Sequence, residues 1–115
     1  MWTIVTVDVF DQWFLVLDDA EQESVLTGLF KLQAVGPQLG RPDVDSLKGA
    51  LKVKNLKELR IQHRGKPYRL LFAFDPARQA VMLCGGDKTS DKRFYERMIP
   101  LAEREFLAYL ASLEV

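Results

Sequence analysis

Changes in the spacing of hydrophobic residues divide the first third of the chain into a strand and two helices. Residues 2–7 alternate β-branched and aromatic side chains, which predicts a strand. Residues 9–17 place their hydrophobic positions at helical spacing, so we expect a short amphipathic helix with Asp8 as its N-cap. A second helix is predicted to begin at residues 18–19, where either aspartate can cap it, and to end at the Gly-Pro pair of residues 36–37. The two helices would form a hairpin.

The rest of the chain predicts a loop, three strands and a final helix. Residues 37–55 contain two glycines and two prolines and are expected to form a loop. The predicted strands cover residues 56–63, 68–75 and 80–84, with turns at residues 64–66 and 75–78. Residues 92–113 keep a helical period that contains Pro100, where we expect a kink or a fresh start. The order β-α-α-β-β-β-α predicts one α+β domain over residues 1–115, with a mostly antiparallel four-stranded sheet, an N-terminal helical hairpin and a C-terminal helix.

The composition is that of a globular protein. The chain has 115 residues, of which 48% are hydrophobic, and this suffices for the core of one domain. It has one cysteine, so no internal disulfide can form, and a reducing compartment is consistent with that. No apolar run approaches the roughly 20 residues needed to span a bilayer, and the N-terminus lacks the basic segment of a secretory signal. We expect a soluble, cytoplasmic protein with no membrane partner.

Charge is unevenly distributed along the chain, although the net charge is zero. Residues 1–47 carry two basic and eight acidic side chains, whereas residues 48–97 carry thirteen basic and five acidic ones. This segregation suggests a basic working face built from the middle of the chain, as nucleic-acid-binding proteins have. The alternative, equally compatible with the composition, is that these lysines and arginines only solvate strands and turns.

Strand alternation sorts the charged residues of the predicted strands. Glu58, Arg60 and Arg64 share one face of their strand, while His63 lies on the other. Arg69 is the only charged side chain among the apolar residues of the next strand, so it needs a partner. That partner is either a carboxylate such as Glu58, in a structural ion pair, or a phosphate.

A pair of glycines follows the last predicted strand and leads into a basic segment. These glycines, residues 85–86, would let the backbone approach another molecule closely. Three cations and a tyrosine come next: Lys88, Lys92, Arg93 and Tyr95. This combination is typical of an RNA site, because cations meet phosphates and rings stack on bases. The alternative is an ordinary strand-to-helix turn in which Asp91 caps the final helix.

Several functional classes lack the residues that they need. With one histidine and one cysteine no His/Cys zinc cluster can form, and we expect neither a metal nor a cofactor. No Walker or GxGxxG spacing is present, and no Ser/His/Asp set is apparent. Cys84 is interpreted as a small buried hydrophobic residue, and His63 as a core or edge histidine.

Four segments in sequence order resemble those of one protein family. They are LKELR at residues 56–60, PYRLLFAFD at 67–75, GGDK at 85–88 and KRFY at 92–95, preceded by the loop RPDVDSLKG at 41–49. On these segments the chain resembles the phage-derived HigB-like branch of the RelE/ParE toxin superfamily, over nearly its whole length. The predicted order of elements agrees with the RelE-like fold of that superfamily.

The resemblance implies a toxin of a type II toxin–antitoxin system, a metal-independent endoribonuclease that inhibits translation by cutting mRNA in the ribosomal A site. In such enzymes the ribose 2′-OH attacks the adjacent phosphate and leaves a 2′,3′-cyclic phosphate, while basic side chains stabilise the transition state. The candidate catalytic residues on this sequence are Arg60, Arg69, Lys88 and Tyr95. Further candidate RNA contacts are Lys57, Arg64, Lys92, Arg93 and Phe94. The implied partners are mRNA, the ribosome and a cognate HigA-like helix-turn-helix antitoxin.

The general base and two rival functions stay open. Lysine is a poor base at neutral pH unless its surroundings lower its pKa, and His63 faces away from Arg60, so no base is assigned. A gyrase-inhibiting toxin of the ParE kind shares the fold but needs no cationic catalytic set, so the four candidate catalytic residues favour the nuclease. A non-catalytic RNA- or ribosome-binding module would use the same basic face without cutting.

Overall fold

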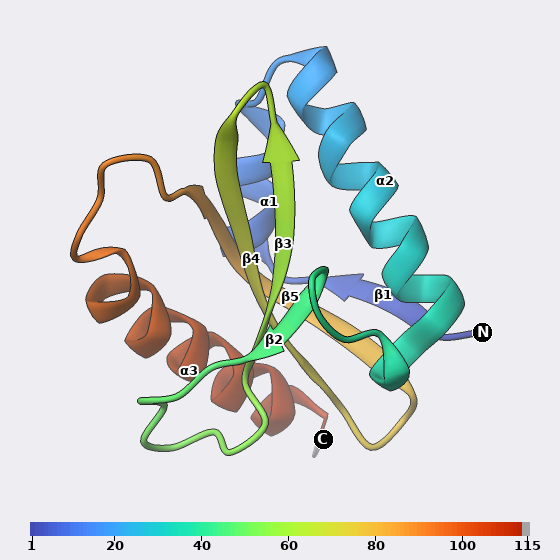
Figure 1. Ribbon diagram of the computed structural model, residues 1–115. Coiled ribbons are helices and arrows are strands. Elements are labelled where there is room, and N and C mark those ends of the chain that lie inside the picture. The colour runs from blue at the N-terminus through green and yellow to red at the C-terminus, as the bar shows by residue number, and fades with distance from the viewer. Residues whose placement is uncertain (114–115) are drawn as a thin grey trace.

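The computed structural model describes residues 1–113, and a single five-stranded sheet organises them (Figure 1). The strands are β1 (Thr3–Thr6), β2 (Val44–Ser46), β3 (Lys57–His63), β4 (Lys66–Phe74) and β5 (Gln79–Asp87). Their order across the sheet is β1-β5-β4-β3-β2. All neighbouring pairs are antiparallel except β1 with β5, which are parallel; the helical hairpin carries the chain from β1 at one edge to β2 at the other.

Helices cover both faces of the sheet, as Figure 1 shows. The helices are α1 (Asp8–Leu15), α2 (Asp19–Val35), the short 3₁₀ helix η1 (Gly36–Gln38) and α3 (Phe94–Ser112). One face packs α1 and α2 against Leu59, Leu70 and Met82, and the other packs α3 against Leu71 and Leu83. Most successive residues of the central strands therefore alternate between the two cores, which is why β4 and β5 are apolar almost throughout.

The fold class predicted from the sequence is confirmed, with one strand added. The helical hairpin, the three-strand meander and the C-terminal helix all form where hydrophobic spacing placed them. The sheet has five strands rather than four, because residues 44–46 of the predicted loop pair with β3. A segment of only three residues is too short to show a period of two, so its spacing carried no signal.

The helix ends confirm one prediction and differ from another. Of the two aspartates predicted as possible caps of α2, Asp18 is the cap: its side chain accepts from the Glu21 backbone N–H at 2.8 Å, and Glu21 accepts from the Asp18 N–H at 2.9 Å. Asp8 is not an N-cap, because it lies inside the first turn of α1 and Val7 precedes the helix without a side-chain hydrogen bond. The helix α3 runs through Pro100 as one element, so no fresh start occurs there.

None of the helices in the described residues is long and apolar enough to cross a membrane.

Candidate functional site

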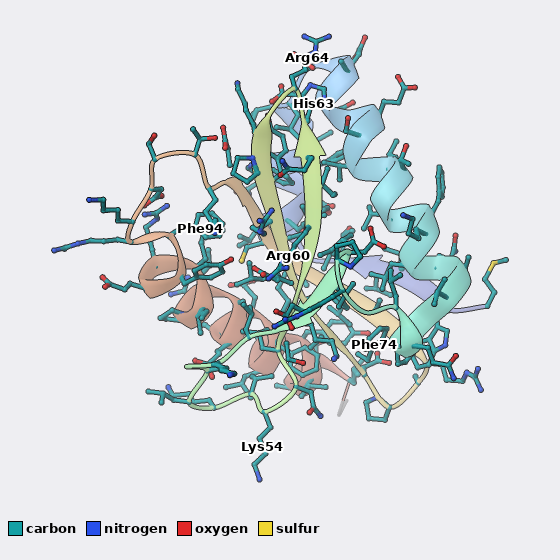
Figure 2. All side chains as sticks on the ribbon, in the orientation of Figure 1. Lys54, Arg60, His63, Arg64, Phe74 and Phe94 are labelled. Atoms are coloured by element: carbon teal, nitrogen blue, oxygen red, sulfur yellow. The ribbon has the colours of Figure 1, made fainter. Side chains whose placement is uncertain are left out.

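Arg60 and Arg69 lie directly opposite each other on neighbouring strands. The antiparallel register of β3 and β4 pairs Arg60 with Arg69 and Glu58 with Leu71. Leu71 belongs to the core beneath α3, so all these side chains lie on the α3 face of the sheet. Figure 2 shows Arg60 near the middle of β3, away from the tip of the β3–β4 hairpin. Strand alternation in the sequence predicted that Glu58 and Arg60 share a face, and the register adds Arg69 to it.

Glu58 is the centre of a cluster of hydrogen bonds and ion pairs that contains three of the four candidate catalytic residues. Its Oε2 accepts from Arg60 Nε at 2.9 Å, and its Oε1 accepts from the Tyr95 hydroxyl at 2.5 Å. Arg69 Nε lies 3.9 Å from the same Oε1. The Glu58 side chain is 3% exposed, that of Arg69 14% and that of Arg60 34%, so the arginines lie between the buried carboxylate and solvent.

Lys88 reaches this cluster from the loop after β5, and Tyr95 reaches it from the start of α3. Tyr95 lies in the first turn of α3, and Lys88 Nζ lies 5.2 Å from the centre of its ring, in cation–π range. Burial, the hydrogen bond to Glu58 and the charge of Glu58 raise the pKa of Tyr95 to about 12, while the charge of Arg69 opposes them. The Tyr95 hydroxyl is therefore protonated at neutral pH and acts as a hydrogen-bond donor.

A second carboxylate, Asp45, enters the cluster from β2. Asp45 is paired with Glu58 across the sheet, and its Oδ2 lies 3.1 Å from Arg60 Nη2 and 2.9 Å from Arg41 Nη2. The Arg41 hydrogen bond lowers the pKa of Asp45 most strongly, with smaller contributions from the charges of both arginines. Asp45 is not among the predicted site residues, because the strand that carries it was predicted as loop.

The two central arginines therefore differ in how far their charge is neutralised. Arg60 is held by two carboxylates, Glu58 and Asp45. Arg69 donates from Nη1 to the Tyr68 carbonyl at 3.0 Å, and its buried Nε has no hydrogen-bond partner among residues 1–113. A buried donor without a partner is uncommon and calls for a physical explanation. Arg69 and Lys88 are thus the members of the cluster best able to bind an added anion such as a phosphate.

The other residues predicted to contact RNA lie around the cluster at different depths. Lys92 and Arg93 are exposed just before α3, and Arg64 is exposed at the tip of the β3–β4 hairpin (Figure 2). Lys57 precedes Glu58 on β3 and so points to the opposite face of the sheet. Its Nζ donates a hydrogen bond to Ser46 Oγ at 3.3 Å, outside the cluster. Phe94 differs from its predicted role as an RNA contact. It is 1% exposed and packs in the core beneath α3, so its ring is not accessible for stacking on a base.

The glycine pair also departs from its predicted use. Gly85 and Gly86 lie inside β5, and both are approached by aromatic side chains of this chain rather than left open. A Cβ at Gly85 would lie 2.5 Å from the Trp13 ring, and one at Gly86 would lie 2.9 Å from the Phe94 ring. The absence of side chains here makes room for α1 on one face and α3 on the other.

His63 lies on the opposite face of the sheet from the cluster. Its Nδ1 is 2.7 Å from Ser24 Oγ of α2, and its ring lies 6.0 Å from the Tyr68 ring. Strand alternation predicted this orientation, which leaves the general base unassigned. Among the described residues no group of three or more His, Cys, Asp or Glu side chains is arranged to hold a metal ion.

Comparison with known proteins identifies relatives of the whole chain. Residues 12–107 match the model of the family described as "Phage derived protein Gp49-like (DUF891)". The chain is 41% identical over 110 residues to "Putative toxin HigB3" of Mycobacterium tuberculosis (strain ATCC 25618 / H37Rv), covering 95% of this chain and 94% of that protein. It is 40% identical over 115 residues to "Putative toxin HigB2" of the same strain, covering 98% of this chain but 56% of that protein.

Solved structures of the Escherichia coli toxin RelE share the fold. The isolated toxin superposes with a TM-score of 0.60 at 13% sequence identity, covering 85% of this chain and 96% of RelE. RelE in the intact RelBE toxin–antitoxin complex gives a TM-score of 0.55 at 13% identity, covering 75% of this chain and 95% of that chain. The RelE-like fold predicted from the sequence is thereby confirmed.

Proposed function

Because the chain belongs to the Gp49-like family and has HigB3 and HigB2 of M. tuberculosis as relatives, we propose that it is the toxin of a type II toxin–antitoxin system and cuts mRNA on the ribosome. One observation carries the nuclease proposal. Arg60, Arg69, Lys88 and Tyr95 come from two strands, a loop and a helix, yet they converge on one face of the sheet. A toxin that only binds a protein target has no need for such a set.

The proposed reaction is attack of a ribose 2′-OH on the adjacent phosphorus. The bond from phosphorus to the 5′-oxygen of the next nucleotide breaks, which leaves a 2′,3′-cyclic phosphate and a 5′-OH. Arg69 and Lys88 would stabilise the negative charge that accumulates on the phosphate oxygens. The single hydroxyl proton of Tyr95 is donated to Glu58, so the role proposed for Tyr95 is to orient the substrate with its ring, beside Lys88. The protein group that accepts the 2′-OH proton is not assigned, and no metal is part of the proposal.

The test is a cell-free translation reaction with purified protein, in which mRNA 5′ ends are mapped with and without ribosomes. We expect cuts at A-site codons only when ribosomes translate. Arg69→Ala and Lys88→Ala should each lower the cutting rate by about 100- to 1,000-fold, as loss of one transition-state donor does. Arg104→Ala is the matched control, because Arg104 is an exposed cation on α3 outside the cluster and should leave cutting unchanged.

Other outcomes point to the rival functions. Intact mRNA together with arrested growth and poisoned gyrase would refute the nuclease and favour a ParE-like toxin. Ribosome binding without new 5′ ends would favour a non-catalytic binding module. Unchanged cutting in Arg69→Ala would place the chemistry outside this cluster.

We further infer a cognate antitoxin, a small helix-turn-helix protein of the HigA kind. Residues 8–35, which form the α1–α2 hairpin, carry six acidic and one basic side chain, and they cover the face of the sheet opposite the cluster, which gives the molecule a second, distinct surface. The expected result is that the product of the adjacent gene copurifies with this chain and suppresses cutting. Failure of that product to bind would contradict the inference.

A further inference from the structure

Glu58 is an acidic residue buried at the centre of the cationic cluster that is proposed to bind a phosphate. The residue is 2% exposed, and Glu58, Asp75 and Glu103 are the buried acidic residues of the described chain. A carboxylate is costly to bury without strong partners. Asp75 and Glu103 accept backbone N–H groups, whereas the partners of Glu58 are side chains of candidate catalytic residues.

We propose that Glu58 is a positioning residue, whose buried carboxylate fixes Arg60 and Tyr95 and thereby leaves Arg69 free to bind the scissile phosphate. This inference rests on the proposed nuclease function. It assigns Glu58 no contact with RNA, because the 3% exposure of its side chain excludes one. Its effect on the reaction passes through the side chains that it orients.

The two carboxylate oxygens of Glu58 accept hydrogen bonds from different residues. Oε2 accepts the Arg60 Nε–H at 2.9 Å, a charge-assisted hydrogen bond that fixes the plane of that guanidinium. Asp45 holds the far end of the same group through Nη2 at 3.1 Å. Arg60 is therefore held at both ends by carboxylates from two adjacent strands, and it has little freedom to rotate.

Oε1 is approached by two donors, and Tyr95 occupies it. The Tyr95 hydroxyl lies 2.5 Å from Oε1, while Arg69 Nε stays 3.9 Å away and has no other partner among the described residues. Tyr95 thus keeps Arg69 from forming a close ion pair with Glu58. Because Arg69 has no close carboxylate partner, the 14% of its side chain that is exposed stays available to a phosphate oxygen.

Glu58→Gln tests the inference, because it keeps the size of the side chain and removes its charge. Glu103→Gln is the matched control: Glu103 is also buried, at 5% exposure, but its Oε2 accepts the backbone N–H groups of Lys52 and Val53, which a glutamine oxygen can still do. We expect Glu58→Gln to lower kcat on the order of 100-fold with a small change in KM, since misplacement of catalytic groups by about 1 Å has effects of that size. Glu103→Gln should keep the wild-type kcat.

A second measurement does not depend on RNA cleavage. In NMR spectra the Arg60 Nε–H should exchange slowly with solvent in the wild type and rapidly in Glu58→Gln, with the exposed Arg104 as the fast-exchanging reference. In Tyr95→Phe the freed Oε1 becomes available to Arg69, so the Arg69 Nε–H should become protected.

The outcomes separate this inference from the proposed function. Full activity of Glu58→Gln, or rapid exchange at Arg60 in the wild type, would overturn the role of Glu58. If the wild-type protein cuts no mRNA, the proposed function fails, while the exchange data still decide whether Glu58 holds Arg60. If Glu58→Gln does not fold, the wild-type and Tyr95→Phe spectra provide the test.

Discussion

Replacing Gly85 with alanine tests whether the glycine pair serves packing within the protein or approach of a ligand. Gly85 faces α1 from β5, and the Trp13 ring fills the space above it. An added Cβ would lie 2.5, 2.6 and 3.0 Å from three atoms of the Trp13 ring. Ordinary carbon contacts lie at roughly 3.5–4.0 Å, so the ring must move by about 1 Å.

The surroundings of Trp13 allow little movement. Its ring packs edge-on against Phe10, with centroids 5.7 Å apart, and against Tyr68, with centroids 6.3 Å apart. Phe10 and Tyr68 are each 2% exposed, so shifting Trp13 disturbs the core itself. Overpacking of this kind costs about 1–3 kcal/mol, and each kcal/mol lowers the Tm of a domain of this size by roughly 4 °C.

The assay is urea denaturation of Gly85→Ala beside Gly40→Ala. A Cβ at Gly40 would meet no atom within 4 Å, so this control should be neutral or slightly stabilising. We expect the unfolding midpoint to fall for Gly85→Ala alone. An unchanged midpoint combined with lost RNA cutting would refute the packing argument and restore the interpretation of the glycine as a point of ligand approach.

Three further predictions concern stability and reactivity. Glu103→Ala should destabilise the protein by roughly 1–3 kcal/mol for each backbone N–H that it orphans, at Lys52 and Val53, and a denaturation midpoint equal to that of Glu103→Gln would contradict this. Burial raises the pKa of Cys84 to about 12, so iodoacetamide at pH 8 should alkylate it only after unfolding in urea, and rapid alkylation of the native protein would show an open core. Finally, hydrogen bonds lower the pKa values of four carboxyl groups. The chief donor is the Glu21 backbone N–H for Asp18 and the Tyr68 hydroxyl for Glu21, while it is the Arg41 side chain for Asp45 and the Arg97 side chain for Asp91. Below about pH 4 these four groups bind protons more readily in the unfolded state than in the folded state. The free energy of unfolding should therefore decrease as the pH is lowered through that range, and a flat profile between pH 6 and pH 3 would refute the assignment.

Much of the site could be predicted because it depends on the most regular parts of the fold. A period of two is a strict property of strands, so Glu58 and Arg60 had to share a face and His63 had to lie on the other. A lone arginine in an apolar strand required a partner, and Glu58, named as one possibility, lies 3.9 Å from Arg69. These inferences needed only local geometry.

The features that the sequence did not reveal depend on contacts between distant segments. The three residues of β2 form a strand only because β3 offers an edge, and Asp45 comes with them. The packing around the glycines of β5 and the burial of Phe94 also depend on contacts between distant segments. Glycine allows close approach by any molecule, and only the folded chain shows that Trp13 and Phe94 are what approach. An aromatic residue beside lysines looks accessible in a sequence whether or not its ring is buried.

The pairing of β1 with β5 sets the order in which the molecule can be completed during its own synthesis. Thr3 is the first residue to pair in the sheet, yet its partner is Gln79, so the N-terminal strand must wait for most of the chain. Tyr95 is made later still, and it closes the cluster around Glu58. A growing chain therefore emerges from the ribosome with its acidic hairpin first and its cationic cluster unfinished, and the cluster forms only when translation of that chain is nearly over.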